Sequence, residues 1–364
     1  MTQQLDHTQG TFQKQPRPLF ANKISSSAAL QVARNEISVA ENQAPKPGDI
    51  IAVRVSNDSE VANLLELGNG RMASVNHRDI IVGALGKRRA LKGFVGYVPE
   101  TLNLGDKLSI LNLGGVLGKV TGGLQGLHAA IEVEYLGSVV NDSGQFANIS
   151  DNAIPLECEF EGRVPIVLVA GTCMQAGKTK AAGELIKRFS REGYQVAGAK
   201  LTGIACLRDT LFMEDYGATK TLDFQSCGFP STIDLDSVSP IAKAIFQRLS
   251  VDEPDVIVVE LGDGIMGYYN VESLFADSEI LDATAATVLC ANDFVGAWGG
   301  IEFLKQKNVQ VDLVSGPATD SGMAVDYIES KFEVDAANAF NDREKFYQTI
   351  KSRVELWKRQ KNLN

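Results

Sequence analysis

The chain has 364 residues, of which 44% are hydrophobic and 22% are charged. This composition is ordinary for a globular protein, and the length exceeds what one hydrophobic core usually organises, so two domains are expected. The net charge of −10, from 35 basic and 45 acidic residues, argues against a general nucleic-acid-binding or anionic-membrane surface.

Five cysteines are scattered along the chain, and no two form a C-x-x-C pair. Such a set is typical neither of a disulfide framework nor of a zinc site, and it suits a reducing compartment. No stretch approaches 18 apolar residues, and the N-terminus lacks a charged segment followed by a long apolar core. We therefore expect a cytoplasmic protein that binds neither nucleic acid nor membranes. A homodimer is left open.

The first third of the chain is expected to hold little helix. Residues 1–47 are interpreted as a mobile arm and lead-in, because their first half is polar and shows no clear period. From 48 to 140, short β-like runs separated by glycines occur at 50–55, 80–85, 93–98, 107–111 and 130–136. This spacing predicts a smaller all-β, barrel-like domain.

A basic cluster stands inside that β-rich stretch, at Lys87, Arg88, Arg89 and Lys92. It is more simply interpreted as a solvated loop between strands than as a contact for a phosphate or an acidic partner. Residues 141–162, which are polar and include Gly144 and Pro155, are predicted to be a linker.

Strand and helix patterns alternate from 163 to 364. Strands are predicted at 164–170, 194–200, 255–260, 285–291 and 309–315, with a weaker one near 334–337. Helices are predicted at 178–191, 240–250, 295–307, 319–331 and 342–358. This alternation predicts a three-layer α/β domain with a mainly parallel sheet. Ligands of such sheets bind outside the carboxyl ends of the strands, so the residues after each strand are the candidates for function.

A phosphate-binding loop is predicted directly after the first of these strands. The segment consists of Gly171, Thr172, Cys173, Met174, Gln175, Ala176, Gly177, Lys178, Thr179 and Lys180. The two glycines permit a tight turn, whose N–H groups and following helix N-terminus can face a polyphosphate. Lys178 would reach the β- and γ-phosphates, and Thr179 would complete a magnesium shell. The first glycine stands one residue earlier than in G-x-x-x-x-G-K-[ST].

The order Gly-Thr-x-x-x-x-Gly-Lys-Thr resembles the phosphate loop of dethiobiotin synthetases, which are ATP-using P-loop enzymes. The resemblance implies that Lys200 matches a strand-end lysine of that family and that Thr202 and Gly203 match the Ser-Gly after it. Asp209 is the nearest match to an aspartate that helps to hold magnesium, and Asp215 is the second choice.

Glu260 ends the next apolar strand, at the place where P-loop sites hold magnesium with a carboxylate. The family strand ends Val-Glu-Gly-Ala-Gly-Gly, so Glu260 matches, whereas Leu261 and Asp263 depart from the pattern. Asp263 could face a metal or a substrate, or it could be a turn residue between glycines. Relatives of this fold hold the nucleotide base where this chain has Ser315, Gly316 and Pro317, and the missing Asn-Lys-x-Asp signature favours adenine over guanine.

The resemblance implies an ATP- and Mg²⁺-dependent ligase with Lys178, Lys200 and Glu260 as catalytic residues. Its substrate would be a small molecule with a carboxylate, carbamate or amine, held near Thr202, Gly203 and Asp263. The loop also resembles that of the D-glutamate N-acetyltransferase family, which implies acetyl-CoA as the cofactor. A third alternative is a nucleotide-controlled adapter, similar to small GTP-binding proteins that deliver metallocofactor precursors.

Overall fold

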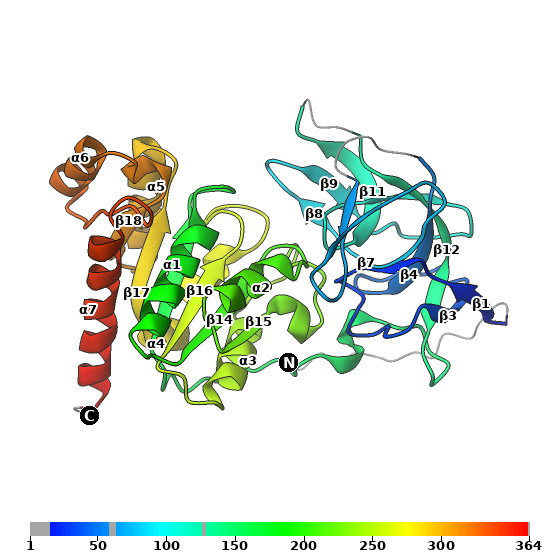
Figure 1. Ribbon diagram of the computed structural model, residues 1–364, viewed down its shortest axis with the longest axis horizontal. Coiled ribbons are helices and arrows are strands. Elements are labelled where there is room, and N and C mark those ends of the chain that lie inside the picture. Colours follow the sequence, from blue (N-terminus) through cyan, green and yellow to red (C-terminus); the bar gives the residue numbers. More distant parts are fainter. Residues whose placement is uncertain (1–14, 58–62, 126–128, 363–364) are drawn as a thin grey trace.

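The structure is a computed structural model that describes residues 15–57, 63–125 and 129–362. Its strands form a ten-stranded sheet in the first third of the chain and a six-stranded sheet in the remainder, with a separate hairpin of two strands. We call residues 17–140 the β-rich part and residues 166–362 the α/β part. Figure 1 shows the two parts side by side along the long axis of the molecule.

The β-rich part is built around a closed path of strand pairings. The path β12–β4–β7–β11–β10 returns to β12, so these five strands form a ring. Side chains alternate between the two faces of β4: Ile51 and Val53 join one apolar cluster, whereas Ile50 and Ala52 join another. The strands are β1 (Arg17–Phe20), β2 (Lys23–Ile24), β3 (Glu36–Ala40), β4 (Ile50–Val55), β5 (Leu64–Glu66), β6 (Met72–Ser74), β7 (Ile80–Leu85), β8 (Arg88–Arg89), β9 (Phe94–Tyr97), β10 (Lys107–Ile110), β11 (Val116–Gly123) and β12 (Glu132–Val140).

The mobile arm predicted at the start of the chain does not extend through residues 17–24, which form β1 and β2, and the lead-in after it contains β3. Strand β1 pairs with β3, β3 pairs with β12, and β2 pairs with β7. The prediction was wrong here because β1 is largely exposed and therefore carries no apolar alternation, although Val39 of β3 is fully buried. Residues 1–14 of the predicted arm lie outside the described residues.

The predicted linker at 141–162 follows a packed course. The amide of Ala147 donates to the carbonyl of Val139 (2.8 Å), and the short 3-10 helix η1 (Ile149–Asn152) buries Ile149. Further along, the amide of Ile154 donates to the carbonyl of Ser226 (2.8 Å). The segment therefore bonds first to the β-rich part and then to the α/β part.

The α/β part contains six parallel strands in the order β15-β14-β16-β13-β17-β18. The predicted parallel α/β sheet is confirmed, and helix α1 has the predicted bounds. The elements are β13 (Ile166–Gly171), α1 (Lys178–Arg191), β14 (Val196–Thr202), α2 (Arg208–Asp215), β15 (Lys220–Asp223), η2 (Phe224–Cys227), α3 (Ser239–Ser250), β16 (Val256–Leu261), η3 (Val271–Ala276), α4 (Ser278–Ala283), β17 (Thr284–Cys290), α5 (Phe294–Gln306), β18 (Leu313–Ser315), η4 (Pro317–Thr319), α6 (Gly322–Phe332) and α7 (Arg343–Asn362). The weak strand predicted near 334–337 is only a bridge between Val314 and Ala336.

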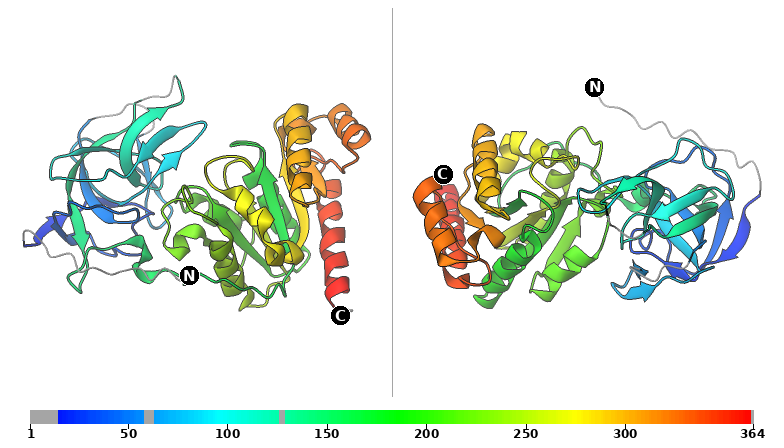
Figure 2. Two further views of the ribbon diagram at one scale, coloured as in Figure 1. Left: turned by 180° about the vertical axis from the view of Figure 1, so that it is seen from behind. Right: turned by 90° about the horizontal axis from the view of Figure 1, so that it is seen from above.

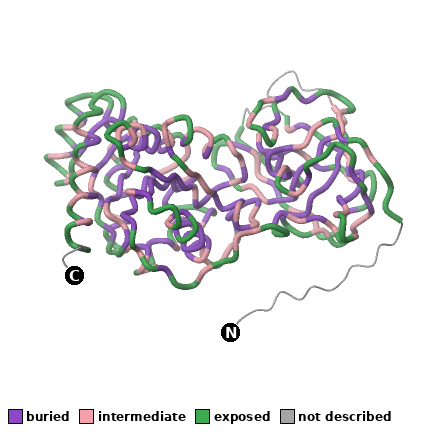
Figure 3. The backbone as a smooth tube through the Cα atoms, turned by 60° about the horizontal axis from the view of Figure 1, so that its bottom comes forward, coloured by how far each residue is buried: buried purple, intermediate pink, exposed green. Residues whose placement is uncertain are grey.

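The central strand β13 is buried on both faces, as its unbroken apolar run requires. Ile166, Leu168 and Ala170 pack in one cluster with residues of α3, α5 and α6. Val167 and Val169 point the other way, into a cluster with α1 and α7. Figure 2 shows helices on both sides of the sheet, and Figure 3 shows buried backbone in the interior of both parts. Among the described residues, no helix has the length and apolar character needed to cross a membrane.

Candidate functional site

The predicted phosphate loop, residues 171–178, connects β13 to α1. Gln175 and Gly177 have positive φ angles of 64° and 99°, so the loop curls and brings successive N–H groups to its inner side. The side chain of Lys178 is buried within this curl, and its Nζ donates to the carbonyl of Cys173 (2.8 Å). The strand, loop and helix together are those of a P-loop α/β fold.

Thr179 and Glu260 meet at the carboxyl edge of the sheet. The hydroxyl of Thr179 donates to Glu260 Oε1 (2.8 Å), because β16 lies beside β13 and aligns Glu260 with Val169. Glu260 is only 2% exposed, and its Oε2 is buried without a hydrogen-bond partner. An unpartnered buried oxygen of this kind costs roughly 1–3 kcal/mol, which a bound cation would offset. A hydroxyl and a carboxylate are the oxygen ligands that Mg²⁺ takes in P-loop sites, so this pair fits the predicted metal.

Lys200 stands between two carboxylates of the same site. Its Nζ forms an ion pair with Asp209, in the first turn of α2, and lies 3.9 Å from Glu260 Oε1. Burial alone would lower the pKa of Lys200, but Glu260 and Asp209 raise it above its ordinary value. The structure thus brings Lys200, Asp209 and Glu260 together as predicted, with Lys200 bound to the acids. Asp215, the second choice for a metal-facing acid, is exposed at the far end of α2.

Asp263 lies between the phosphate loop and the β-rich part. Burial raises the pKa of Asp263, and the nearby charges of Lys178 and Arg88 act in the opposite direction. Burial likewise lowers the pKa of Lys178, while Glu260 and Asp263 oppose that shift. Asp263 also has a φ of 67°, as the turn residue that its position between glycines allowed would have.

Two predicted substrate contacts are corrected by the structure. The side chain of Thr202 is fully buried and donates to the carbonyl of Gly262 (3.0 Å), so it does not face a ligand. The amide of Gly203 donates to the hydroxyl of Thr232 (3.1 Å) and is already satisfied. Thr202 therefore ties the end of β14 to the loop after β16, and Gly203 ties it to the segment between η2 and α3.

The close approach of these two loops predicts a stability effect. A Cβ on Gly262 would lie 2.1 Å from the carbonyl oxygen of Thr202, so Gly262→Ala must displace backbone. We expect a loss of about 2 kcal/mol in the free energy of unfolding, measured by urea denaturation. Gly299→Ala is the control, because a Cβ there meets nothing within 4 Å. Equal stability of the two variants would contradict the prediction.

The segment predicted to hold the nucleotide base borders the phosphate loop only in part. A Cβ on Gly177 would lie 3.3 Å from Gly316 Cα, and Pro317 is exposed beside it. Ser315 is fully buried, and its hydroxyl accepts from the amide of Ala339 (3.3 Å), so its predicted contact with a base is corrected. Sequence analysis missed Asn338, whose amide donates to the Gly316 carbonyl (3.2 Å) and holds this loop.

Asp223 is a further buried acid of the site that sequence analysis missed. It ends β15 next to Lys200 of β14 and accepts from the Ser226 amide (3.2 Å). Burial raises the pKa of Asp223 to about 6, against the opposing influence of the Ser226 amide and Lys200. Its only sequence signal is a carboxylate before a short polar turn.

Asp223 predicts a pH-dependent stability difference. The folded chain keeps this proton to about pH 6, whereas an ordinary aspartate loses it near 3.8, so folding is disfavoured progressively as the pH rises between these values. Asp223→Asn removes the titration. The free energy of unfolding of this variant, relative to that of the wild type, should rise from pH 4 to pH 6 and then stay constant. The total rise should be no more than about 3 kcal/mol. A difference that is the same at pH 4 and pH 7 in urea denaturation would contradict this.

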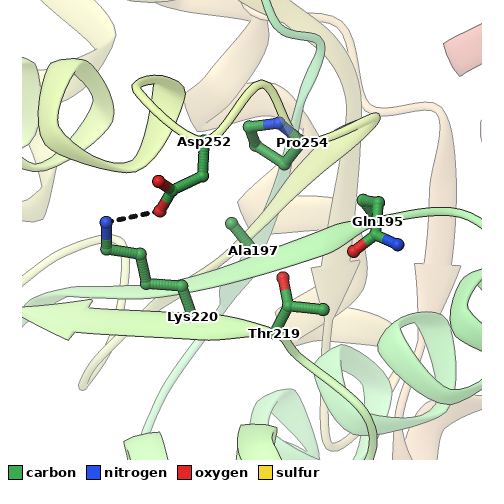
Figure 4. Close-up of a pocket in the computed structure, with 6 residues that line it drawn as sticks. All are labelled: Gln195, Ala197, Thr219, Lys220, Asp252 and Pro254. Carbon is green, nitrogen blue, oxygen red and sulfur yellow. Dashed lines mark hydrogen bonds and ion pairs between the residues drawn. The ribbon is translucent and has the colours of Figure 1, made fainter.

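A cavity of about 260 Å³ lies at the amino ends of the strands, opposite the end that carries the phosphate loop. It is lined by residues that precede or begin β14, β15 and β16, and the ion pair between Lys220 and Asp252 (2.5 Å) spans it (Figure 4). The cavity is separate from the phosphate-loop site because it lies at the other end of the strands. Ligands of parallel sheets bind at the carboxyl ends, so the cavity is not where such a ligand is expected.

Comparisons with known proteins yield structural similarity alone. No family model matches the sequence, and no curated protein matches it. Chloroplast FtsY from Physcomitrella patens is 14% identical with a TM-score of 0.38, over 56% of this chain and 70% of that one. FtsY from Thermotoga maritima is 18% identical with a TM-score of 0.38, over 55% and 71%. A duf1611 family protein from Anabaena variabilis is 13% identical with a TM-score of 0.40, over 58% and 66%. Because all three TM-scores are below 0.5, the function proposed below rests on the contacts of this chain.

Proposed function

We propose that this chain binds a nucleoside triphosphate with Mg²⁺ and cleaves the bond to its terminal phosphate. The observation that carries the proposal is the triad of Lys178, Thr179 and Glu260. A phosphate-loop lysine, a hydroxyl and a buried carboxylate with one unpartnered oxygen converge at the start of α1. These are the parts that phosphoryl transfer uses in P-loop proteins.

Each part has a distinct task. The loop amides and the N-terminus of α1 bind the phosphates. When the nucleotide binds, the ammonium group of Lys178 releases its hydrogen bond to the Cys173 carbonyl and contacts a phosphate oxygen instead. Thr179 and Glu260 hold Mg²⁺, which supplies positive charge to the terminal phosphates when bound. Lys200 keeps Asp209 and Glu260 in place. Catalysis would come from positioning and charge, with no covalent bond to the protein.

The acceptor of the phosphoryl group is proposed to be a small carboxylate or carbamate, with ATP as the donor. The resemblance to dethiobiotin synthetases supports this choice, and the missing guanine signature favours ATP. One part of the ligase scheme changes: Lys200 is occupied by two carboxylates, so the charge of the acceptor must be met by another cation.

The contacts of Glu66 support the adapter as a second candidate. Glu66 of β5 is buried, and its Oε2 accepts from the Leu207 amide (2.7 Å), directly before α2, which carries Asp209. The β-rich part is therefore bonded to an element of the nucleotide site, as an adapter that signals its nucleotide state requires. Phosphate release stimulated by small carboxylates selects the ligase, and release that none of them stimulates selects the adapter.

The experiment that tests nucleotide use is a thermal shift with ATP, GTP or acetyl-CoA, each with and without Mg²⁺, followed by a phosphate-release assay. ATP with Mg²⁺ should raise the Tm, by linkage to binding, and EDTA should remove the metal-dependent part. Stabilisation by acetyl-CoA alone would overturn the proposal in favour of an acyltransferase.

A further inference from the structure

The hairpin of β8 and β9, residues 88–97, is anchored on the α/β part. Just before it, Lys87 forms an ion pair with Asp234 (2.7 Å), and Arg89 forms another with the same carboxylate (3.1 Å). The guanidinium of Arg89 also lies 5.1 Å above the ring of Tyr268. The solvated loop expected for this basic cluster is therefore wrong. Figure 1 shows the hairpin projecting from the β-rich part toward the loops at the edge of the six-stranded sheet.

Arg88 holds the hairpin to the rest of the β-rich part. Its guanidinium donates to the carbonyl of Leu111, and a Cβ on Gly93 would lie only 2.6 Å from its Nη2. Burial lowers the pKa of Arg88, while Tyr269 and Asp263 oppose the shift. Arg88 and Lys178 therefore both face the charge of Asp263, one from each part of the chain. The charge of Asp263 thus interacts with a cation of the hairpin and with a cation of the phosphate loop.

Lys92 is the member of the cluster that remains available. Its Nζ lies 3.5 Å from Gln175 Oε1, and within the described ranges no carboxylate lies within 4 Å of it. Gln175 belongs to the curled arc of the phosphate loop and is exposed. The anchored hairpin therefore presents an exposed ammonium group beside Gln175 of the phosphate loop.

We propose that Lys92 contacts the phosphoryl group that is transferred, so that the β-rich part supplies a catalytic cation to the nucleotide site of the same chain. The proposal rests on the proposed function. Lys92 forms no covalent bond and stays protonated. It neutralises charge on the terminal phosphate while the bond to the leaving nucleoside diphosphate breaks and the acceptor oxygen bonds to phosphorus. Arg88 and Asp234 are positioning residues, because they hold the hairpin and do not touch the nucleotide.

The expected signature of Lys92 is a loss of kcat with intact product binding. A cation added by a finger residue accelerates P-loop hydrolysis by roughly 10³–10⁵, and an exposed lysine is a single point charge, so we expect Lys92→Ala to lower kcat by about 10- to 100-fold. The affinity for ADP with Mg²⁺ should not change, since ADP lacks the terminal phosphate. Lys92→Arg should restore most of the rate.

The test compares phosphate release and fluorescent ADP binding for the full-length wild type, Lys92→Ala, Lys92→Arg and Lys305→Ala. Lys305 is a control of equal charge, exposed in the last turn of α5, at the edge of the sheet opposite the loop. Asp234→Ala should release the hairpin and lower kcat in the same direction. A wild type without nucleotide-dependent phosphate release would overturn the proposed function itself. An active wild type with Lys92→Ala equal to Lys305→Ala, or with ADP binding weakened while kcat stays unchanged, would overturn the role of Lys92 alone.

Discussion

Replacing Lys178 with alanine is expected to lower nucleotide turnover by at least about 1,000-fold. Lys178 is 6% exposed, sits inside the phosphate loop and lies in the same site as Glu260. In a site shielded from water, one positioned charge contributes far more to stabilising a transition state than an exposed charge does. Steady-state phosphate release and binding of ATP with Mg²⁺, compared with the wild type, measure the effect.

The fold should survive this substitution. Burial lowers the pKa of Lys178, so the folded chain holds its charge at a cost, and Lys178→Ala should keep or raise the Tm. Lys187→Ala is the matched control, since Lys187 lies on the same helix, is partly exposed and pairs with Glu184 at 3.7 Å, outside the phosphate loop. Turnover of Lys178→Ala above a tenth of the wild-type value would contradict the assignment of Lys178 and its loop as the site of nucleotide cleavage.

The second large effect is expected for Glu260→Gln, which should lower turnover by about 100- to 1,000-fold and abolish the Mg²⁺-dependent rise in Tm on adding ATP. Glutamine keeps the shape and can still accept from the Thr179 hydroxyl, but it lacks the charge that the unpartnered Oε2 carries. Nucleotide binding without Mg²⁺ should remain, because the loop amides and Lys178 are unchanged.

Glu184→Gln separates the loss of a buried charge from the loss of the metal ligand. Glu184 lies on α1 with only 7% of its surface exposed, outside the phosphate loop. Its variant should keep both turnover and the metal-dependent Tm increment. Should Glu260→Gln keep the wild-type dependence of turnover on Mg²⁺ concentration, the assignment of this edge of the sheet as a metal site would fail.

Local sequence determined the phosphate loop and its two neighbours. The apolar run of β13, the glycines at 171 and 177 and the helix pattern after Lys178 are short-range signals, so the bounds of α1 follow from them directly. The meeting of Thr179 with Glu260 could also be predicted, because the carboxyl ends of neighbouring parallel strands share one edge of a sheet.

Side-chain direction at that edge required the tertiary structure. Thr202 and Ser315 end strands on the same side of the sheet as the phosphate loop, yet each side chain turns into the protein to bond another loop. A single-residue step decides between the two faces of a strand. The role of Asp223 could not be predicted for a similar reason, because its burial beside Lys200 depends on the pairing of β14 with β15.

The sequence by itself determined which residues could bind a polyphosphate, since that chemistry is encoded within one strand, one turn and one helix. Only the tertiary structure decided which cations are free to act there: Lys200 is bound by Asp209, whereas Lys92 reaches Gln175 from the other part of the chain. Long-range pairing of this kind leaves no local pattern, because the ion pairs of Asp234 that hold the hairpin join segments far apart in the sequence.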